Sequence, residues 1–376
     1  MTQRVATLLC LVGAMMAGSA VAQDEGAADA PAGVEAPGEA MPVGEGGVPH
    51  ATAENTVLPD EMTPALNESI ADGLRALADS QRDDGAFGGQ RFGSNAGITA
   101  LACLAFMADG NIPGRGEYAR NVERGLEFIL SVTNETGLIA ADTSHGPMYG
   151  HGFATLFLGE VYGMTAGGGD TAQSRRVHDA LVRACRLIVQ TQNDEGGWRY
   201  NPVPHDADIS VTICQIMALR SARNAGIEVP KETIDRAVQY VRDSQNPDGG
   251  FRYQLNRGPS AWPRSAAGVA SLYYAGVYED EALDLGLAYL IRQALPGQAP
   301  AAQTHYYYGH YYAVQAMYLA GGQWWAAWWP AVREELISRQ RDDGTWDDPA
   351  NGSAYGTASA LIILQMPKRY LPIFQK

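Results

Sequence analysis

Residues 192–198 read QNDEGGW, and the same pattern returns three more times in the chain. The other copies are QRDDGAF at 81–87, QNPDGGF at 245–251 and QRDDGTW at 340–346. Each copy has Gln first, an acid at the fourth position, Gly at the fifth and Phe or Trp at the seventh. Weaker copies begin at Thr133 and Gln293, which makes six starts at intervals of 47 to 59 residues. A period of this length indicates one supersecondary unit used six times.

Each unit contains two stretches with a helical period. The stretch before the motif is amphipathic, as where Ile234, Val238 and Val241 share one face. The stretch after the motif is apolar nearly all round, which is typical of a helix buried on every side. Residues 96–107, 209–219, 265–275 and 355–366 are of this second kind. We therefore predict an all-α fold, an (α/α)6 toroid of six outer and six inner helices over residues 63–376, with an open solenoid as the alternative.

The motif itself has a structural interpretation. Its Gly suits the left-handed position after a helix end, its aromatic residue can pack over the junction between units, and its Gln can satisfy free carbonyls at helix ends. The residues to which we assign this role are Gln81, Gly85, Phe87, Gln192, Gly196, Trp198, Gln245, Gly249, Phe251, Gln340, Gly344 and Trp346.

Composition divides the chain before the repeats begin. Residues 1–22 have a charged start, a short apolar core and a small-residue cleavage site, so we expect a signal peptide and export to the periplasm or the cell exterior. Residues 23–62 are rich in Ala, Gly, Pro and acids, with no Lys or Arg, and are predicted to be a disordered linker. Residues 63–376 carry 26 of the 27 Lys and Arg and 33 of the 42 Asp and Glu, and this formal net charge of −7 argues against a nucleic-acid partner, which would need a basic face.

The repeats resemble the QW motif of squalene and oxidosqualene cyclases, and the β subunits of protein prenyltransferases are built similarly. The chain looks most like exported proteins with prenyltransferase and squalene oxidase repeats. The resemblance covers residues 63–376, and it implies an α/α toroid with a central apolar cavity and a site at one rim. These cyclases protonate their substrate with an Asp-x-Asp-Asp motif at the start of an inner helix.

Two motifs of the resembled families are not intact in this chain. The nearest match to the acid motif is Asp206-Ala207-Asp208-Ile209, where Ile209 replaces the last Asp, and in a second register Ser210 replaces the proton donor. The Asp-x-Cys zinc pair of the prenyltransferases is absent, so we assign no metal ligand and expect no cofactor. Whether the chain is an enzyme stays open at this point. The plain alternative for the two aspartates is a helix N-cap.

Histidines, tyrosines and arginines concentrate where the inner helices begin. Five of the seven histidines fall there: His145, His151, His205, His305 and His310. Parallel inner helices would bring their N-termini, with free N–H groups, to one rim. We take Asp208, Tyr308 and His310 as catalytic candidates. The ligand-binding candidates are Tyr149, His151, Arg199, Asp206, Arg252, Arg264, His305, Tyr307, Tyr311 and Tyr355.

The sequence thus favours a protein that binds an isoprenoid-like or other amphiphilic ligand, with its polar or anionic head at this rim, and it leaves open whether the ligand is also transformed. A polysaccharide lyase-like enzyme that uses Tyr, His and Arg on acidic glycans is a second interpretation. A non-catalytic binding or scaffold protein is the third. Four tryptophans, Trp324, Trp325, Trp328 and Trp329, are predicted to pack between helices, although they are also compatible with peripheral membrane contact.

Overall fold

The computed structural model describes residues 61–89, 91–143, 146–165, 171–256, 258–298 and 305–375. All of them belong to one compact unit, residues 51–376. The predicted signal peptide, the predicted linker up to residue 60 and the candidate His145 lie outside the described residues.

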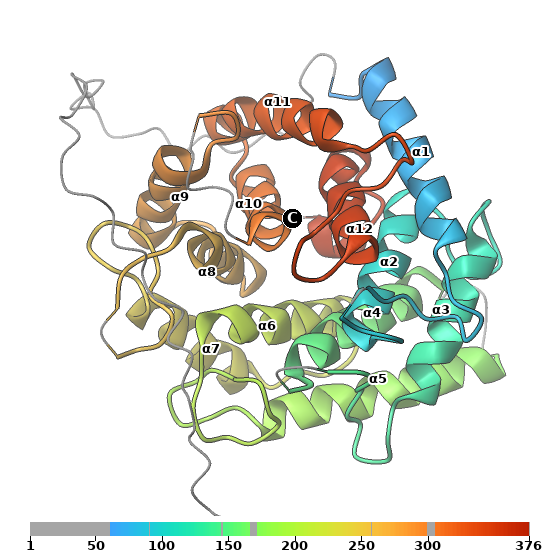
Figure 1. The fold of residues 1–376 in the computed structure, drawn as a ribbon. Coiled ribbons are helices and arrows are strands. Elements are labelled where there is room, and N and C mark those ends of the chain that lie inside the picture. The colour runs from blue at the N-terminus through green and yellow to red at the C-terminus, as the bar shows by residue number, and fades with distance from the viewer. Residues whose placement is uncertain are drawn as a thin grey trace, which may run out of the picture. The chain divides into compact units, whose positions relative to one another are not determined.

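The described residues contain twelve α-helices and no β-strand, so the predicted all-α class is confirmed. Odd-numbered helices form the outer layer and even-numbered helices the inner layer (Figure 1). The outer helices are α1 (Pro64–Asp79), α3 (Ala119–Ser131), α5 (Ala172–Gln190), α7 (Lys231–Asp243), α9 (Glu281–Ala294) and α11 (Gly322–Arg339). The inner helices are α2 (Ala96–Ala108), α4 (Met148–Thr165), α6 (Ile209–Asn224), α8 (Trp262–Tyr274), α10 (Tyr306–Ala320) and α12 (Ser353–Leu364), followed by the 3-10 turns η3 (Met366–Lys368) and η4 (Pro372–Phe374).

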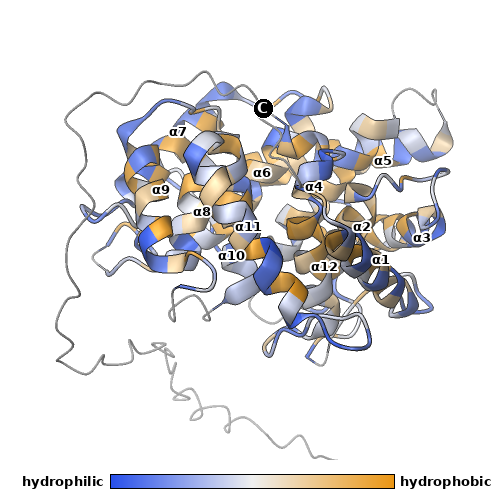
Figure 2. Ribbon diagram, turned by 90° about the horizontal axis from the view of Figure 1, so that it is seen from above, coloured by the Kyte–Doolittle hydropathy of each residue, from blue (hydrophilic) through white to orange (hydrophobic). Residues whose placement is uncertain are grey.

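The helices close into a ring, which excludes the open solenoid. Each inner helix contacts the next inner helix, and α12 contacts α2. In the outer layer α11 contacts α1, so the last repeat meets the first there as well (Figure 1). The difference between the layers follows from their sequences, since all residues of α2 are buried whereas α3 buries one face only. Figure 2 shows the same contrast in hydropathy, with orange dominating α2.

The Gln of each full motif ties its own turn to the next outer helix. The Gln192 Nε2 donates to the Gly196 carbonyl at 2.8 Å and to the Thr233 carbonyl of α7, also at 2.8 Å. The equivalent pairs of carbonyls are Gly85 and Asn121 for Gln81, Gly249 and Ala282 for Gln245, and Gly344 and Ser69 for Gln340. The Gln amide therefore joins neighbouring units, and the bond from Gln340 to Ser69 joins the last unit to the first.

Gly is required at the fifth motif position for two reasons. Gly196 has a φ of +99°, and a Cβ there would lie 2.3 Å from the Arg236 carbonyl oxygen of α7. Both the left-handed backbone and the close approach exclude other residues. The aromatic residue two positions later fills the junction: Trp198 is buried, and its indole N–H donates to the Ile188 carbonyl at 2.7 Å.

The tryptophans near the start of α11 pack at the junction with α1. Trp325 and Trp329 are stacked and buried, and the Trp325 indole N–H donates to the Glu61 carboxylate at 2.8 Å. Glu61 is itself buried, although the sequence placed it in the linker. These contacts show that packing is the role of Trp325 and Trp329. None of the helices in the described ranges combines the length and the apolar character that a membrane crossing needs.

Candidate functional site at the N-terminal mouth of the ring

Asp208 is the N-cap residue of α6, as the N-cap interpretation predicted. Its backbone is extended, and its Oδ1 accepts a hydrogen bond from the Val211 N–H at 2.9 Å. The side chain has no exposed surface. Its backbone N–H donates to the Trp198 carbonyl at 3.0 Å, which fixes the start of the inner helix to the preceding motif. The repeat therefore holds this carboxyl group at the mouth of the ring, where the inner helices begin.

Two tyrosines and an arginine surround the other side of this carboxyl group. The Tyr253 hydroxyl donates to Asp208 Oδ2 at 3.3 Å and is also hydrogen-bonded to the Tyr200 hydroxyl. The Arg199 Nε lies 3.8 Å from Asp208 Oδ2, and its NH1 pairs with Asp206. The guanidinium stands 5.2 Å from the ring centre of Tyr200. The Asp208 carboxyl group is therefore covered by the rings of Tyr200 and Tyr253 and by the guanidinium of Arg199.

The protonation state of Asp208 is set mainly by burial. Desolvation raises its pKa to about 6, against the opposing effects of the Val211 N–H, Arg199 and Tyr253. Burial also raises the pKa of Tyr149 well above its ordinary value, with the Asp208 charge as a further cause. The site consequently holds a carboxyl group that exchanges its proton close to neutral pH, next to phenols that stay protonated.

Aromatic side chains from the first turns of the inner helices meet at the ring axis. The Tyr308 hydroxyl donates to the Ser210 carbonyl at 3.3 Å, and the Tyr312 hydroxyl lies 3.3 Å from the Cys214 Sγ. Both contacts join α10 to α6, which are not neighbours in the ring. The rings of Tyr311 and Phe153 are in edge contact at 5.9 Å, which joins α10 to α4. Where the resemblance implied a central apolar cavity, these aromatic side chains occupy the centre.

Some of these side chains remain partly exposed, which defines the mouth. Tyr149 and Phe153 of α4, Tyr308 of α10 and Tyr355 of α12 are half-buried, while most of their helix neighbours are buried. Tyr308 and Tyr355 lie within electrostatic reach of each other, and Tyr149 within reach of Tyr308. We call Tyr149, Phe153, Tyr308 and Tyr355 the mouth aromatics. They form an apolar surface with hydroxyl groups, and Tyr149 and Tyr308 lie within electrostatic reach of Asp208.

His151 is not part of this mouth. Its Nδ1 accepts a hydrogen bond from the Ile139 N–H at 3.2 Å, and its side chain is fully buried. In other units a hydroxyl on the inner helix accepts the same bond from the motif aromatic, as Thr212 does from the Trp198 N–H at 3.1 Å. The equivalent acceptors are Thr99, Ser265 and Thr357. His151 therefore replaces a hydroxyl in the unit whose motif has Ile139 instead of Phe or Trp.

His310 of α10, a catalytic candidate from the sequence, lies among aromatic side chains of α8, α10 and α11. It is fully buried among Trp262, Tyr306 and Trp328, with ring centres 4.4 to 5.6 Å away. Burial lowers its pKa to about 3, so the imidazole stays neutral. Ala299, the seventh residue of the motif in this unit, lies outside the described residues.

The remaining candidates are only partly brought together. The Arg264 Nε donates to the Phe251 carbonyl at 3.0 Å, and Arg252 donates to the Asp243 carbonyl, so both arginines hold backbone turns. His305 is exposed ahead of α10, and Tyr307 is buried near Arg339 of α11, away from Asp208. Asp206 and Arg199 do meet Asp208. Tyr311 lies within the central aromatic cluster.

Tyr200 and Tyr253 contribute to the site although they were not among our site candidates. Each is the second residue after a motif aromatic, in the runs Trp198-Arg199-Tyr200 and Phe251-Arg252-Tyr253. The repeat places both at the same kind of turn. Their identical spacing was the available signal, since equivalent positions in neighbouring units lie side by side at the mouth.

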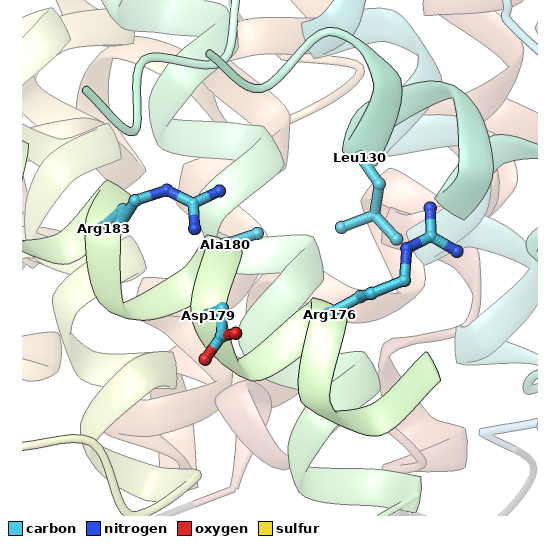
Figure 3. Close-up of a pocket in the computed structure, with 5 residues that line it drawn as sticks. All are labelled: Leu130, Arg176, Asp179, Ala180 and Arg183. Atoms are coloured by element: carbon cyan, nitrogen blue, oxygen red, sulfur yellow. The ribbon is translucent and has the colours of Figure 1, made fainter. Parts of the chain in front are cut away.

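A groove also exists on the outside of the ring, remote from this chemistry. It has a volume of about 190 Å³ and is lined by Leu130 of α3 and by Arg176, Asp179, Ala180 and Arg183 of α5 (Figure 3). Arg176 is paired with Glu127, at 2.9 Å. The groove is shallow and lies between two outer helices, so it does not communicate with Asp208.

Comparison with known proteins supports the class that the fold defines. No family model matches the chain. A drimenyl diphosphate synthase of Streptomyces showdoensis is 29% identical over 171 residues, which are 46% of this chain and 28% of that protein. The type II terpene cyclase MstE of Scytonema, without ligand, superposes with a TM-score of 0.56 at 15% identity, over 82% of this chain and 100% of that chain. The chain spans about a quarter of the length of the synthase that it matches.

A glycoside hydrolase shares the architecture equally well. An inactive variant of an α-1,6-mannanase of Salegentibacter, in complex with α-1,6-mannotetrose, superposes with a TM-score of 0.61 at 9% identity, over 80% of this chain and 98% of that chain. At such identities the likeness concerns the fold alone. The protein is an α/α toroid, an architecture that it shares with terpene cyclases and with this glycoside hydrolase.

Proposed function

We propose that the protein binds an isoprenoid chain at the mouth of the ring, against the mouth aromatics. In this proposal the Asp208 carboxyl group is the proton donor to the bound chain. One observation carries this proposal: a fully buried carboxyl group with a pKa of about 6 lies beneath Tyr200 and Tyr253 and beside half-exposed aromatic rings. Aromatic faces bind apolar chains and stabilise cations. The similarity to terpene cyclases supports the choice of ligand.

The charges at the mouth favour a ligand with an uncharged head. Arg199 is the cation beside Asp208, and two carboxyl groups already engage it. Arg252 and Arg264 donate to backbone carbonyls. Placing a diphosphate here would require breaking these contacts. We therefore propose a neutral isoprenoid, such as a prenyl alcohol or a prenylated phenol, in preference to a free diphosphate.

The lyase-like alternative receives less support from the residues. A Tyr-His-Arg mechanism needs a histidine at the site, and His151 and His310 are buried in structural positions. The exposed His205 lies beside Asp206, at 3.8 Å, on the outer side of Arg199. Cleavage of acidic glycans by the wild-type protein would support this alternative. A panel of uronate-containing glycans, with absorbance detection, tests it.

A binding titration tests the proposal directly. We expect geranylgeraniol to change the intrinsic tryptophan fluorescence of the wild type, and Tyr149→Ala or Tyr308→Ala to weaken its binding by about tenfold, since each removes a ring worth roughly 1–2 kcal/mol of contact. Tyr278→Ala, at an exposed position beyond the C-terminal end of α8, is the control and should bind normally. Equal affinity in all four proteins would refute the site. Gas chromatography of the same mixtures shows whether wild type, but not Asp208→Asn, also converts the ligand.

A further inference from the structure

A second buried acid lies at the opposite end of the ring. Glu160 of α4 is 1% exposed, and its Oε1 accepts a hydrogen bond from the Ser221 hydroxyl at 2.7 Å. Ser221 is 13 residues after Asp208 along α6, which corresponds to about 20 Å of helix. Tyr274 and Tyr311 lie within electrostatic reach of Glu160. None of the contacts at the mouth explains why a carboxyl group is kept here.

The chain's own C-terminal segment satisfies this acid. The Ile373 N–H donates to Glu160 Oε2 at 3.1 Å. Leu371, Ile373 and Phe374 are buried, and η4 packs against α4 and α6. In the view along the ring, the C-terminus lies at its centre (Figure 1). We call residues 371–375 the C-terminal plug, because they enter this end of the ring between inner helices.

The plug is attached to the ring at its base. The Gln365 Nε2 donates to the Ala105 carbonyl of α2 at 2.9 Å, and Lys368 pairs with Asp109. Arg369 then takes a left-handed backbone conformation, with φ of +58°, and turns the chain toward the ring axis. Among the described residues, Glu160 is the one side chain that accepts a hydrogen bond from an N–H of the plug, which follows this turn. The side-chain bonds of the attachment, from Gln365 and Lys368, therefore lie outside residues 371–375.

We infer that the C-terminal plug occupies a ligand site and that a prenyl alcohol binds there by displacing it. This inference rests on the proposed function. The plug presents the branched apolar side chains of Leu371 and Ile373, with Pro372 between them, together with one hydrogen-bond donor at the carboxyl group. An alcohol with a branched apolar chain offers the same combination, since its O–H replaces the Ile373 N–H. A hydrocarbon lacks the donor, and a diphosphate would place negative charge beside Glu160.

Displacement of the plug can be followed by carboxypeptidase digestion of the full chain with mass-spectrometric readout. Without ligand, we expect trimming to stop after the exposed Gln375, because Phe374 and Ile373 are buried. Geranylgeraniol should carry trimming through Phe374 and Ile373. The matched hydrocarbon and geranylgeranyl diphosphate should not. Trimming that does not respond to geranylgeraniol, in a sample that demonstrably binds it, would overturn the inference.

A truncated chain provides the affinity test. A variant that ends at Leu371 should bind geranylgeraniol about tenfold more tightly than a control that ends at Gln375, because a competing internal occupant has been removed. Phe374→Asp, at full length, should have the same effect by expelling the plug, and it serves if the truncated chain does not fold. Equal affinity in plug variants and control contradicts the inference alone. Absence of isoprenoid binding in every variant contradicts the proposed function, and with it this inference.

Discussion

At the scale of single residues, the repeat motif serves the fold and Asp208 serves the site. Gln192 is 8% exposed, and its amide donates to two backbone carbonyls in different units. Asp208 shows how the same repeat can carry chemistry. It occupies an ordinary N-cap position, yet its burial beneath Tyr200 and Tyr253 raises the pKa of its carboxyl group to about 6.

Replacing a motif Gln should destabilise the ring without changing the mouth. Gln192→Leu leaves the carbonyls of Gly196 and Thr233 without their donor, and we expect the free energy of unfolding to fall by about 1–3 kcal/mol. Gln239→Leu, on the exposed face of α7, is the matched control and should cost less than about 0.5 kcal/mol. Urea denaturation followed by circular dichroism measures both. Equal losses in the two variants would show that the inter-unit bonds contribute nothing.

The raised pKa of Asp208 predicts a pH dependence of stability. Its pKa rises from 3.8 to about 6 on folding, so the folded state binds this proton more tightly than the unfolded state. The resulting stabilisation is complete below about pH 4 and is lost as the pH rises through 6, by at most about 3 kcal/mol. The difference in unfolding free energy between wild type and Asp208→Asn should therefore change between pH 4 and pH 7. A difference that is constant over this range would mean that the Asp208 pKa is not raised.

At the scale of elements, one hydrogen bond recurs between the motif and the first turn of the inner helix. In four units Ser or Thr accepts it from the N–H of Phe or Trp, and in the second unit His151 accepts it from Ile139. The larger acceptor coincides with the smaller motif residue, so the total volume at the junction is kept. This compensation explains why a histidine near the rim faces the motif turn and the outer layer.

The compensation can be tested by a double-mutant cycle. His151→Thr and Ile139→Phe should each destabilise the protein, the first by leaving a cavity and the second by overpacking, at roughly 1–4 kcal/mol. The double variant restores the arrangement of the other units, and we expect it to regain at least about 1 kcal/mol over the sum of the single effects. Thermal or urea unfolding measures the four proteins. Strict additivity would show that the two positions are not coupled.

The repeat explains which parts of this structure could be predicted from the sequence. Helix order, ring closure and the N-cap role of Asp208 follow from spacing, because local period and capping chemistry are written along the chain. The sequence does not show in which direction a side chain points on a helix that is apolar on every face. Hence His151 and His310 were grouped with the mouth, although they face the outer layer. Tyr200 and Tyr253 belong to the tyrosines that the sequence places at this rim, but they were not selected as ligand-binding candidates. Glu160 gave no signal, because its partner Ile373 is 213 residues away.

At the scale of the whole molecule, the ring has two ends with different chemistry. The N-terminal mouth combines Asp208 with the mouth aromatics, and the other end holds Glu160 beneath the C-terminal plug. Aromatic contacts from α10 to α4 and α6 separate the two ends. A ligand at the mouth therefore contacts the side chains that cover Asp208 without moving the plug, whereas a ligand at Glu160 has to displace it. The two sites can be examined independently for this reason.

Photocrosslinking tests the central claim, isoprenoid binding at the mouth, most directly. A geranylgeraniol analogue with a diazirine on its chain would be irradiated with the protein, and the labelled residues mapped by peptide mass spectrometry. Binding at the mouth predicts labels on Tyr149, Phe153, Tyr308 and Tyr355. It also predicts that these labels are lost when unlabelled geranylgeraniol is added in excess. Labels confined to the groove of Leu130 and Arg183, or spread over the outer helices and insensitive to competition, would contradict it.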